Sequence, residues 1–178
     1  MGLHFTELDD ATRRYMVAEF DADLISGDLY NSVWFTDRAR IDYPELCRIA
    51  LTSGTDDSLT TVLSVPGMFV TDYQKRKPKG GFTTASVPFT APATFAEGEF
   101  GRFYLRGLCL RLLDEGTDQV EIYRAKQVAN PRSASNLLIG TAVDPTALLA
   151  DLRTSTGIDT ALGLPPGPNS GLSGMRRQ

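Results

Sequence analysis

The chain has 178 residues, a formal net charge of −4 and an apolar content of 42%. This length is enough to bury one good-sized core, so a single domain is expected. Proteins that coat nucleic acid usually carry a basic domain or a basic face, and the net negative charge excludes coating by bulk electrostatics. Contact with nucleic acid would have to come from a local basic patch.

Two cysteines, Cys47 and Cys109, lie in apolar segments with helical spacing. A free thiol in such a segment behaves as a small buried hydrophobe, so a disulfide scaffold is not expected. The first residues lack the charged start and apolar stretch of a signal peptide, and no apolar run approaches the roughly 18 residues of a membrane span. We therefore expect a protein that is cytoplasmic when synthesised, with no membrane partner.

Apolar residues recur at helical spacing through the first third of the chain, which predicts three helices. Thr6 is followed three positions later by an acidic residue, as in a capping box, and predicts the start of the first helix. Pro44 suits the first turn of the second helix. Thr55 or Asp56 can cap the third helix.

The pattern then changes to that of strands on either side of a basic run. Met68–Tyr73 leads into the run and Phe82–Phe89 leads out of it, and both are rich in aromatic residues, Val or Thr. This arrangement predicts a β-hairpin. Four cations occupy five positions at its tip: Lys75, Arg76, Lys77 and Lys79.

The basic tip has two interpretations. A tight turn would hold the four side chains near one another, and their mutual repulsion favours an anionic partner such as phosphate. The alternative is a solvated loop whose lysines protect an exposed sheet edge from unwanted pairing. The sequence leaves both interpretations open.

A second long helix is predicted at about residues 94–115, with one apolar ridge facing the core: Phe100, Tyr104, Leu108 and Leu112. Arg102 and Arg106 are four residues apart and share a helix face. Glu99 can pair with Arg102, so an ordinary salt-bridged surface is their expected role. Residues 120–126 alternate apolar with charged side chains, which predicts a half-exposed strand.

The chain closes with a last predicted helix and an arm. Asp144 and Pro145 fit the cap and the first position of that helix. Residues 157–178 are dense in Gly, Pro, Ser and Asn and predict an extended arm or disordered tail. Its sparse apolar residues could lie in a groove of a neighbour: Ile158, Leu162 and Leu164. A chain end without a role is the alternative.

We therefore predict an α+β fold. It has a helical N-terminal part, a central β-hairpin, a long helix packed on a small, mostly antiparallel sheet, and an extended C-terminal arm. The predicted domain spans residues 1–156, and the arm spans residues 157–178.

No motif indicates catalysis. His4 precedes the first helix and has no partner nearby in the sequence, so we expect it to be mobile. The two cysteines lie on apolar faces, without the electropositive helix start that favours a thiolate. Paired aspartates at helix starts are expected to cap helices and complement their dipoles. We expect no catalytic residue, no cofactor and no metal.

Two functional hypotheses follow. The first is a non-enzymatic structural protein that self-associates as a homo-oligomer or joins a larger particle, with a phage-type virion as an analogy. The second is a nucleic-acid-binding module that places the hairpin tip against phosphates. Binding by the four cations should weaken steeply as salt rises, whereas apolar packing should persist. An enzyme that borrows a residue or cofactor ranks third.

Overall fold

The computed structural model describes residues 2–128, 133–155 and 171–177. Within these residues the chain forms six helices and two small antiparallel sheets, which confirms the predicted α+β class. None of the described helices is long and apolar enough to cross a bilayer. The elements in chain order are α1 (Asp10–Ser26), α2 (Asp37–Ser53), α3 (Asp56–Leu63), β1 (Asp72–Arg76), β2 (Phe82–Ser86), α4 (Ala91–Asp114), β3 (Val120–Arg124), α5 (Ser133–Leu138), β4 (Ala142–Val143), α6 (Pro145–Thr154) and β5 (Leu172–Arg176).

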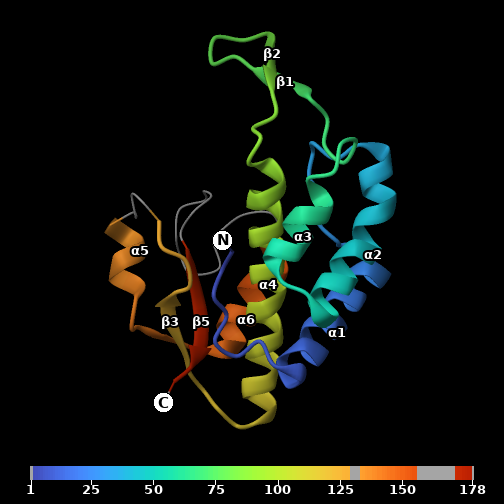
Figure 1. Cartoon of the computed structure of the whole chain (residues 1–178). Coiled ribbons are helices and arrows are strands. Elements are labelled where there is room, and N and C mark those ends of the chain that lie inside the picture. The colour runs from blue at the N-terminus through green and yellow to red at the C-terminus, as the bar shows by residue number, and fades with distance from the viewer. Residues whose placement is uncertain (1, 129–132, 156–170, 178) are drawn as a thin grey trace.

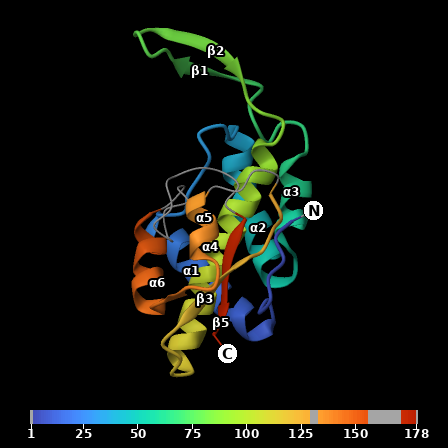
Figure 2. The same ribbon diagram turned by 90° about the vertical axis from the view of Figure 1, so that its left-hand side faces the viewer.

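The helices and sheets are arranged around α4. Figure 1 shows α4 running through the middle of the molecule, with α1, α2 and α3 on one side and β3 and β5 on the other. The larger sheet has the order β4-β3-β5, and the smaller consists of β1 and β2 alone. Figure 2 shows that β3 and β5 cross in front of α4, and that β1 and β2 stand apart from the body.

Helix α4 is buried around its whole circumference over two central turns, because residues 102–109 are all buried. Helices α1, α3 and α6 and strand β5 all pack against it. The predicted apolar ridge from Phe100 to Leu112 is fully buried. Phe103, on another face, meets Phe20 of α1 edge-on, with ring centroids 5.4 Å apart. Helix α4 is therefore the centre of the core.

Helix α1 approaches α4 closely at Gly107. A Cβ at this position would lie 2.7 Å from Cγ of Met16 and 3.0 Å from the carbonyl oxygen of Thr12. Glycine inside a helix costs roughly 1 kcal/mol relative to alanine. The close packing of the two helices offsets that cost, so their crossing depends on the missing side chain.

A buried ion cluster fixes the same crossing. Arg106 is 1% exposed, and its guanidinium donates to Glu19 at 2.7 Å and to Asp23 at 2.6 and 2.7 Å, both on α1. Arg153 of α6 donates to the same Glu19 at 2.5 Å. Burial by itself would raise the pKa of Glu19, but hydrogen bonds and charge from Arg153 and Arg106 outweigh it and lower that pKa. The resulting stabilisation is present above the unfolded pKa and is lost as the pH falls through the lowered value.

The predicted surface role of Arg102 and Arg106 is wrong. The spacing correctly paired Arg102 with Glu99, whose carboxylate lies 2.5 Å away, but both side chains are buried. A helix presents a charged face to water only if that face is uncovered. The central turns of α4 have no such face, so their arginines meet carboxylates inside the molecule.

The first helix begins later than predicted. Asp9, not Thr6, is its cap, and the Asp9 side chain accepts a hydrogen bond from the Thr12 amide at 3.0 Å. The preceding residues follow the sheet instead, because the His4 amide donates to the Ala125 carbonyl at 2.8 Å. His4 is therefore held by its backbone, which corrects the expectation that it is mobile.

The second helix begins earlier than predicted. Thr36 is its cap and accepts from the Ala39 amide at 3.1 Å, which leaves Pro44 inside the helix. Proline there removes a helical hydrogen bond. Tyr43 and Cys47 on the same helix are fully buried, and this tertiary packing overrides the local cost.

The predicted starts of α3 and α6 are confirmed. Thr55 and Ser58 form a reciprocal capping box at α3. Asp144 caps α6 by accepting from the Ala147 amide at 2.7 Å, with Pro145 as the first helical residue. Local capping chemistry is sufficient to locate both helices.

The last described residues form a strand, which corrects the prediction of an arm for this part of residues 157–178. Strand β5 pairs antiparallel with β3, with Ile122 opposite Gly174. A Cβ at Gly174 would lie 2.5 Å from Cγ1 of Val120, so only glycine lets the strand pack this closely. A short strand of small residues has little apolar pattern, and it forms here because it completes the free edge of β3.

The proposed arm residues Ile158, Leu162 and Leu164 lie outside the described residues. In the chain they come between α6 and β5, both of which belong to the body. Their role in assembly stays a prediction.

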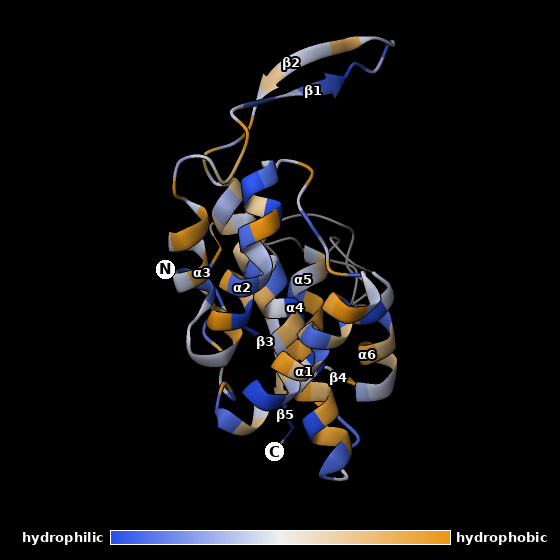
Figure 3. Ribbon diagram, turned by 90° about the vertical axis from the view of Figure 1, so that its right-hand side faces the viewer, coloured by the Kyte–Doolittle hydropathy of each residue, from blue (hydrophilic) through white to orange (hydrophobic). Residues whose placement is uncertain are grey.

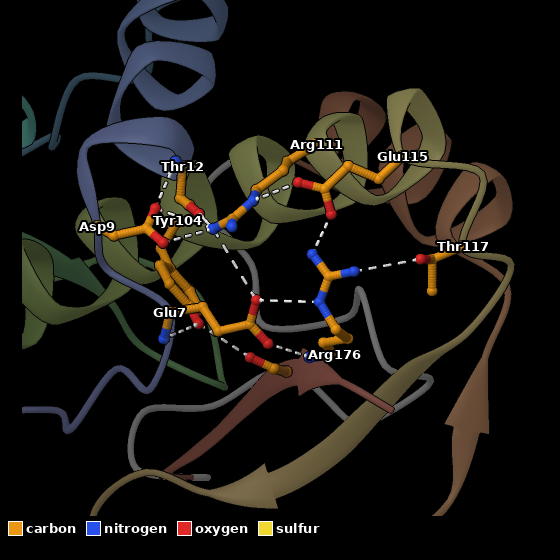
Figure 4. Close-up of polar contacts among 9 residues, drawn as sticks. Glu7, Asp9, Thr12, Tyr104, Arg111, Glu115, Thr117 and Arg176 are labelled. Atoms are coloured by element: carbon orange, nitrogen blue, oxygen red, sulfur yellow. Dashed lines mark hydrogen bonds and ion pairs between the residues drawn. The ribbon is translucent and has the colours of Figure 1, made fainter. Parts of the chain in front are cut away.

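Polar contacts attach β5 to the N-terminal segment and to the end of α4 (Figure 4). The Arg176 amide donates to Glu7 at 2.6 Å, and the Arg176 guanidinium pairs with Glu115. Arg111 pairs with Asp9 at 2.8 Å and with Glu115 at 2.9 Å. Both ends of the described chain therefore meet the last turn of α4.

The buried cluster gives the first prediction. Arg106→Met should lower the free energy of unfolding by about 3–5 kcal/mol, because it removes one partner from a buried ionic cluster. Arg48→Met is the control, since it breaks an exposed pair with Asp21 at 2.8 Å and should hardly change the urea midpoint at pH 7. Equal losses in the two variants would contradict the assignment.

Strand β5 leads to a second prediction. Deletion of residues 171–178 should lower the melting temperature strongly, because it uncovers Val120 and Ile122 and leaves the β3 edge unpaired. Replacing Ile158, Leu162 and Leu164 with Ser keeps β5 and is the comparison. Circular dichroism melts of both chains measure the difference, and an unchanged melt of the truncated chain would show that β5 is dispensable.

Candidate interaction site

Strands β1 and β2 form a two-stranded ribbon, which confirms the predicted hairpin. Their register runs from Asp72 opposite Ser86 to Arg76 opposite Phe82. The turn is closed by the Lys77 amide, which donates to the Gly81 carbonyl at 3.0 Å. Gly80 and Gly81 have φ values of 91° and 77°, a conformation that side-chain-bearing residues rarely adopt. The Gly-Gly pair therefore shapes the tip.

The ribbon is attached to the body only at its base. Tyr73 and Ala85, opposite each other, are the half-buried residues of the two strands, and the others are exposed. The ring of Tyr73 lies 5.4 Å from that of Trp34, and the Val70 amide donates to the Trp34 carbonyl at 2.9 Å. Isolated two-stranded hairpins are at best marginally stable in water. Both faces of the ribbon are therefore open to a partner.

The four cations surround the tip and do not form one flat patch. Successive side chains of a strand point to opposite faces, so Lys75 lies on one face with Thr83, and Arg76 lies on the other with Phe82. The remaining two, Lys77 and Lys79, belong to the turn. All four are exposed, and none forms an ion pair within the described part of the chain.

Uncovered apolar side chains accompany these charges. Phe82 is 65% exposed beside Arg76, and Phe89, in the link between β2 and α4, is 94% exposed. Figure 3 shows β1 as uniformly hydrophilic and β2 as carrying the apolar residues of the ribbon. An exposed aromatic beside an exposed cation is typical of contact residues at interfaces.

A groove lies at the ribbon end of the body, between α2 and the end of α3. We call it the α2/α3 groove; its volume is about 370 Å³, and its apolar lining is Ile41, Leu46, Val62, Val65 and Met68. Ile41 is 78% exposed and Val65 is 47% exposed. The groove therefore leaves apolar side chains uncovered at the same end of the molecule as the ribbon.

The two cysteine side chains are buried, whereas the histidine side chain is exposed. Burial raises the pKa of Cys47 and of Cys109 to about 12, so both thiols are protonated near neutral pH and are poor nucleophiles. His4 is exposed at the edge of the sheet. Among the described residues, no group of three or more His, Cys, Asp or Glu side chains could hold a metal ion.

The Glu99–Arg102 pair is the other unusual polar feature. Burial raises the pKa of Glu99 to about 7, although the charge of Arg102 opposes this. Nε and Nη1 of Arg102 have no hydrogen-bond acceptor in the described structure. Both side chains are buried, and the Arg102 guanidinium lies 5.2 Å from the centroid of the Phe103 ring, so the pair is not a surface site.

Comparison of the chain with protein-family models, with curated proteins and with solved structures found no match. The sequence locates the ribbon and its cations because charge and strand pattern are local signals. It misses Phe82 as a contact residue, because only the strand register places it beside Arg76. It also misses the α2/α3 groove, whose lining comes from two helices and the segment after α3.

Proposed function

We propose that this protein is a non-enzymatic assembly protein, which associates with further copies or joins a larger particle through its basic ribbon. One observation carries the proposal: a two-stranded ribbon stands off the helical body with both faces exposed. The body gains little from such a ribbon, since only its base is packed. A partner that covers Phe82 and pairs with the four cations would give the ribbon the contacts that the fold does not supply.

A second contact through Ile158, Leu162 and Leu164 belongs to the same proposal and stays a prediction. The particle in which such a subunit would repeat, a phage-type virion in the sequence-based hypothesis, is an analogy. The exposure of the ribbon supports its proposed role as the contact element. Contacts between unlike surfaces of identical subunits form rings or extended arrays, depending on whether the rotation between subunits closes.

Nucleic-acid binding is the second candidate. Four exposed cations around a tip can contact phosphates, and a two-stranded ribbon is narrow enough to enter the major groove of DNA. In this candidate the acidic body would limit the contact to the ribbon. Binding would then weaken steeply with salt, whereas apolar contacts between protein copies would persist.

Light scattering tests the proposal. The wild type should exceed the monomer mass without nucleic acid. Replacing Lys75, Arg76, Lys77 and Lys79 with Ser should leave the melting temperature unchanged, because these side chains are exposed, and should return the mass to the monomer.

Arg14→Ser combined with Arg177→Ser is the charge control, because Arg14 on α1 and Arg177 at the C-terminus are exposed on the body, away from the ribbon. It should associate as the wild type does. A wild type that is monomeric alone and gains mass only with a DNA and RNA mixture at low salt would favour nucleic-acid binding and contradict assembly.

A further inference from the structure

The α2/α3 groove combines an apolar floor with an acidic rim. Asp42 and Glu45 lie along it on α2. Arg38 also lines it and donates to Asp42 at 3.2 Å. Glu45 forms no ion pair with any described residue. The groove therefore suits an apolar side chain that comes with positive charge.

The ribbon carries this combination. Phe82 and Arg76 are directly opposite each other across the two strands and share one face. Lys77 and Lys79 follow in the turn, so the apolar ring lies within a positive field. Phe82 can cover the exposed Ile41, while Arg76 and the lysines approach Glu45 and Asp42.

The ribbon of the same copy is not placed to fill the groove. Figure 3, which faces α2 and α3, shows the ribbon rising from this end of the body with its tip directed away from both helices. The five paired positions of the ribbon extend about 17 Å before the turn begins. A ribbon that fills the groove would therefore come from a second molecule.

We propose that the ribbon of one copy docks in the α2/α3 groove of a second copy, with Phe82 against Ile41 and the basic tip against Glu45 and Asp42. The inference rests on the proposed self-association and names its surface. A nucleic acid is not a fitting occupant, since the carboxylates of the rim would repel phosphate. Two copies that exchange ribbons would close as a dimer, and a one-way contact would extend into a ring or array.

Two single substitutions test each side of the contact. Phe82→Asp places a negative charge opposite the acidic rim, and Ile41→Lys places a positive charge opposite the basic tip. Both positions are largely exposed, so the melting temperatures should stay at the wild-type value. Each variant alone should be monomeric in light scattering at concentrations where the wild type associates.

Mixing the two variants gives the decisive result. Phe82→Asp retains an intact groove and Ile41→Lys retains an intact ribbon, so an equimolar mixture should form a complex of the two chains. Ile25→Lys is the matched control, because Ile25 is 88% exposed on α1 outside the groove, and it should associate normally.

The outcomes separate this inference from the proposed function. If Phe82→Asp is monomeric but Ile41→Lys associates as the wild type does, assembly through the ribbon holds and the groove is excluded as its partner. Two monomeric variants that stay monomeric when mixed would also overturn the docking. A wild type that is monomeric at every concentration would overturn the proposed self-association itself.

Discussion

The structure depends on the enclosure of α4, and above all on the buried ionic contact between Arg106 and the carboxylates of α1. Two turns of this helix have no exposed face, so a guanidinium there must find acceptors inside the protein. Glu19 and Asp23 supply them. Because the approach at Gly107 is equally specific, the position of α1 on α4 is fixed by both charge and shape. Buried ion pairs add little net stability over apolar packing. We therefore interpret the cluster as specifying one way for α1 to cross α4.

This enclosure separates the body from the ribbon. The helices and the β4-β3-β5 sheet pack together around α4. Both ends of the described chain form ion pairs with residues at the last turn of α4. The ribbon contributes almost nothing to that core beyond the contact of Tyr73 with Trp34. Under the proposed function, substitutions in the ribbon should therefore change association without changing the fold. This separation of stability from contact suits a subunit that must fold before it meets its neighbours.

The sequence predicts what local chemistry decides. The hairpin, its cations, the start of α3 at one of its two candidate caps, Thr55, and the start of α6 at Asp144 all follow from signals within a few residues. Burial of Arg102 and Arg106 could not be predicted from the sequence. The two arginines would have the same spacing if the helix lay at the surface. Strand β5 was missed because its pairing with β3 joins segments about 50 residues apart. The α2/α3 groove could not be predicted either, because it depends on how two helices pack against each other.

Native-state hydrogen exchange of the ribbon amides tests the central claim that another molecule completes the ribbon. In dilute monomer the Lys77 and Gly80 amides should exchange rapidly, because their hydrogen bonds close an exposed tip. In the associated form the same amides should become protected, while those in the centre of α4 remain equally protected in both. Ribbon amides that are strongly protected in the monomer, or that still exchange rapidly after association, would contradict the account.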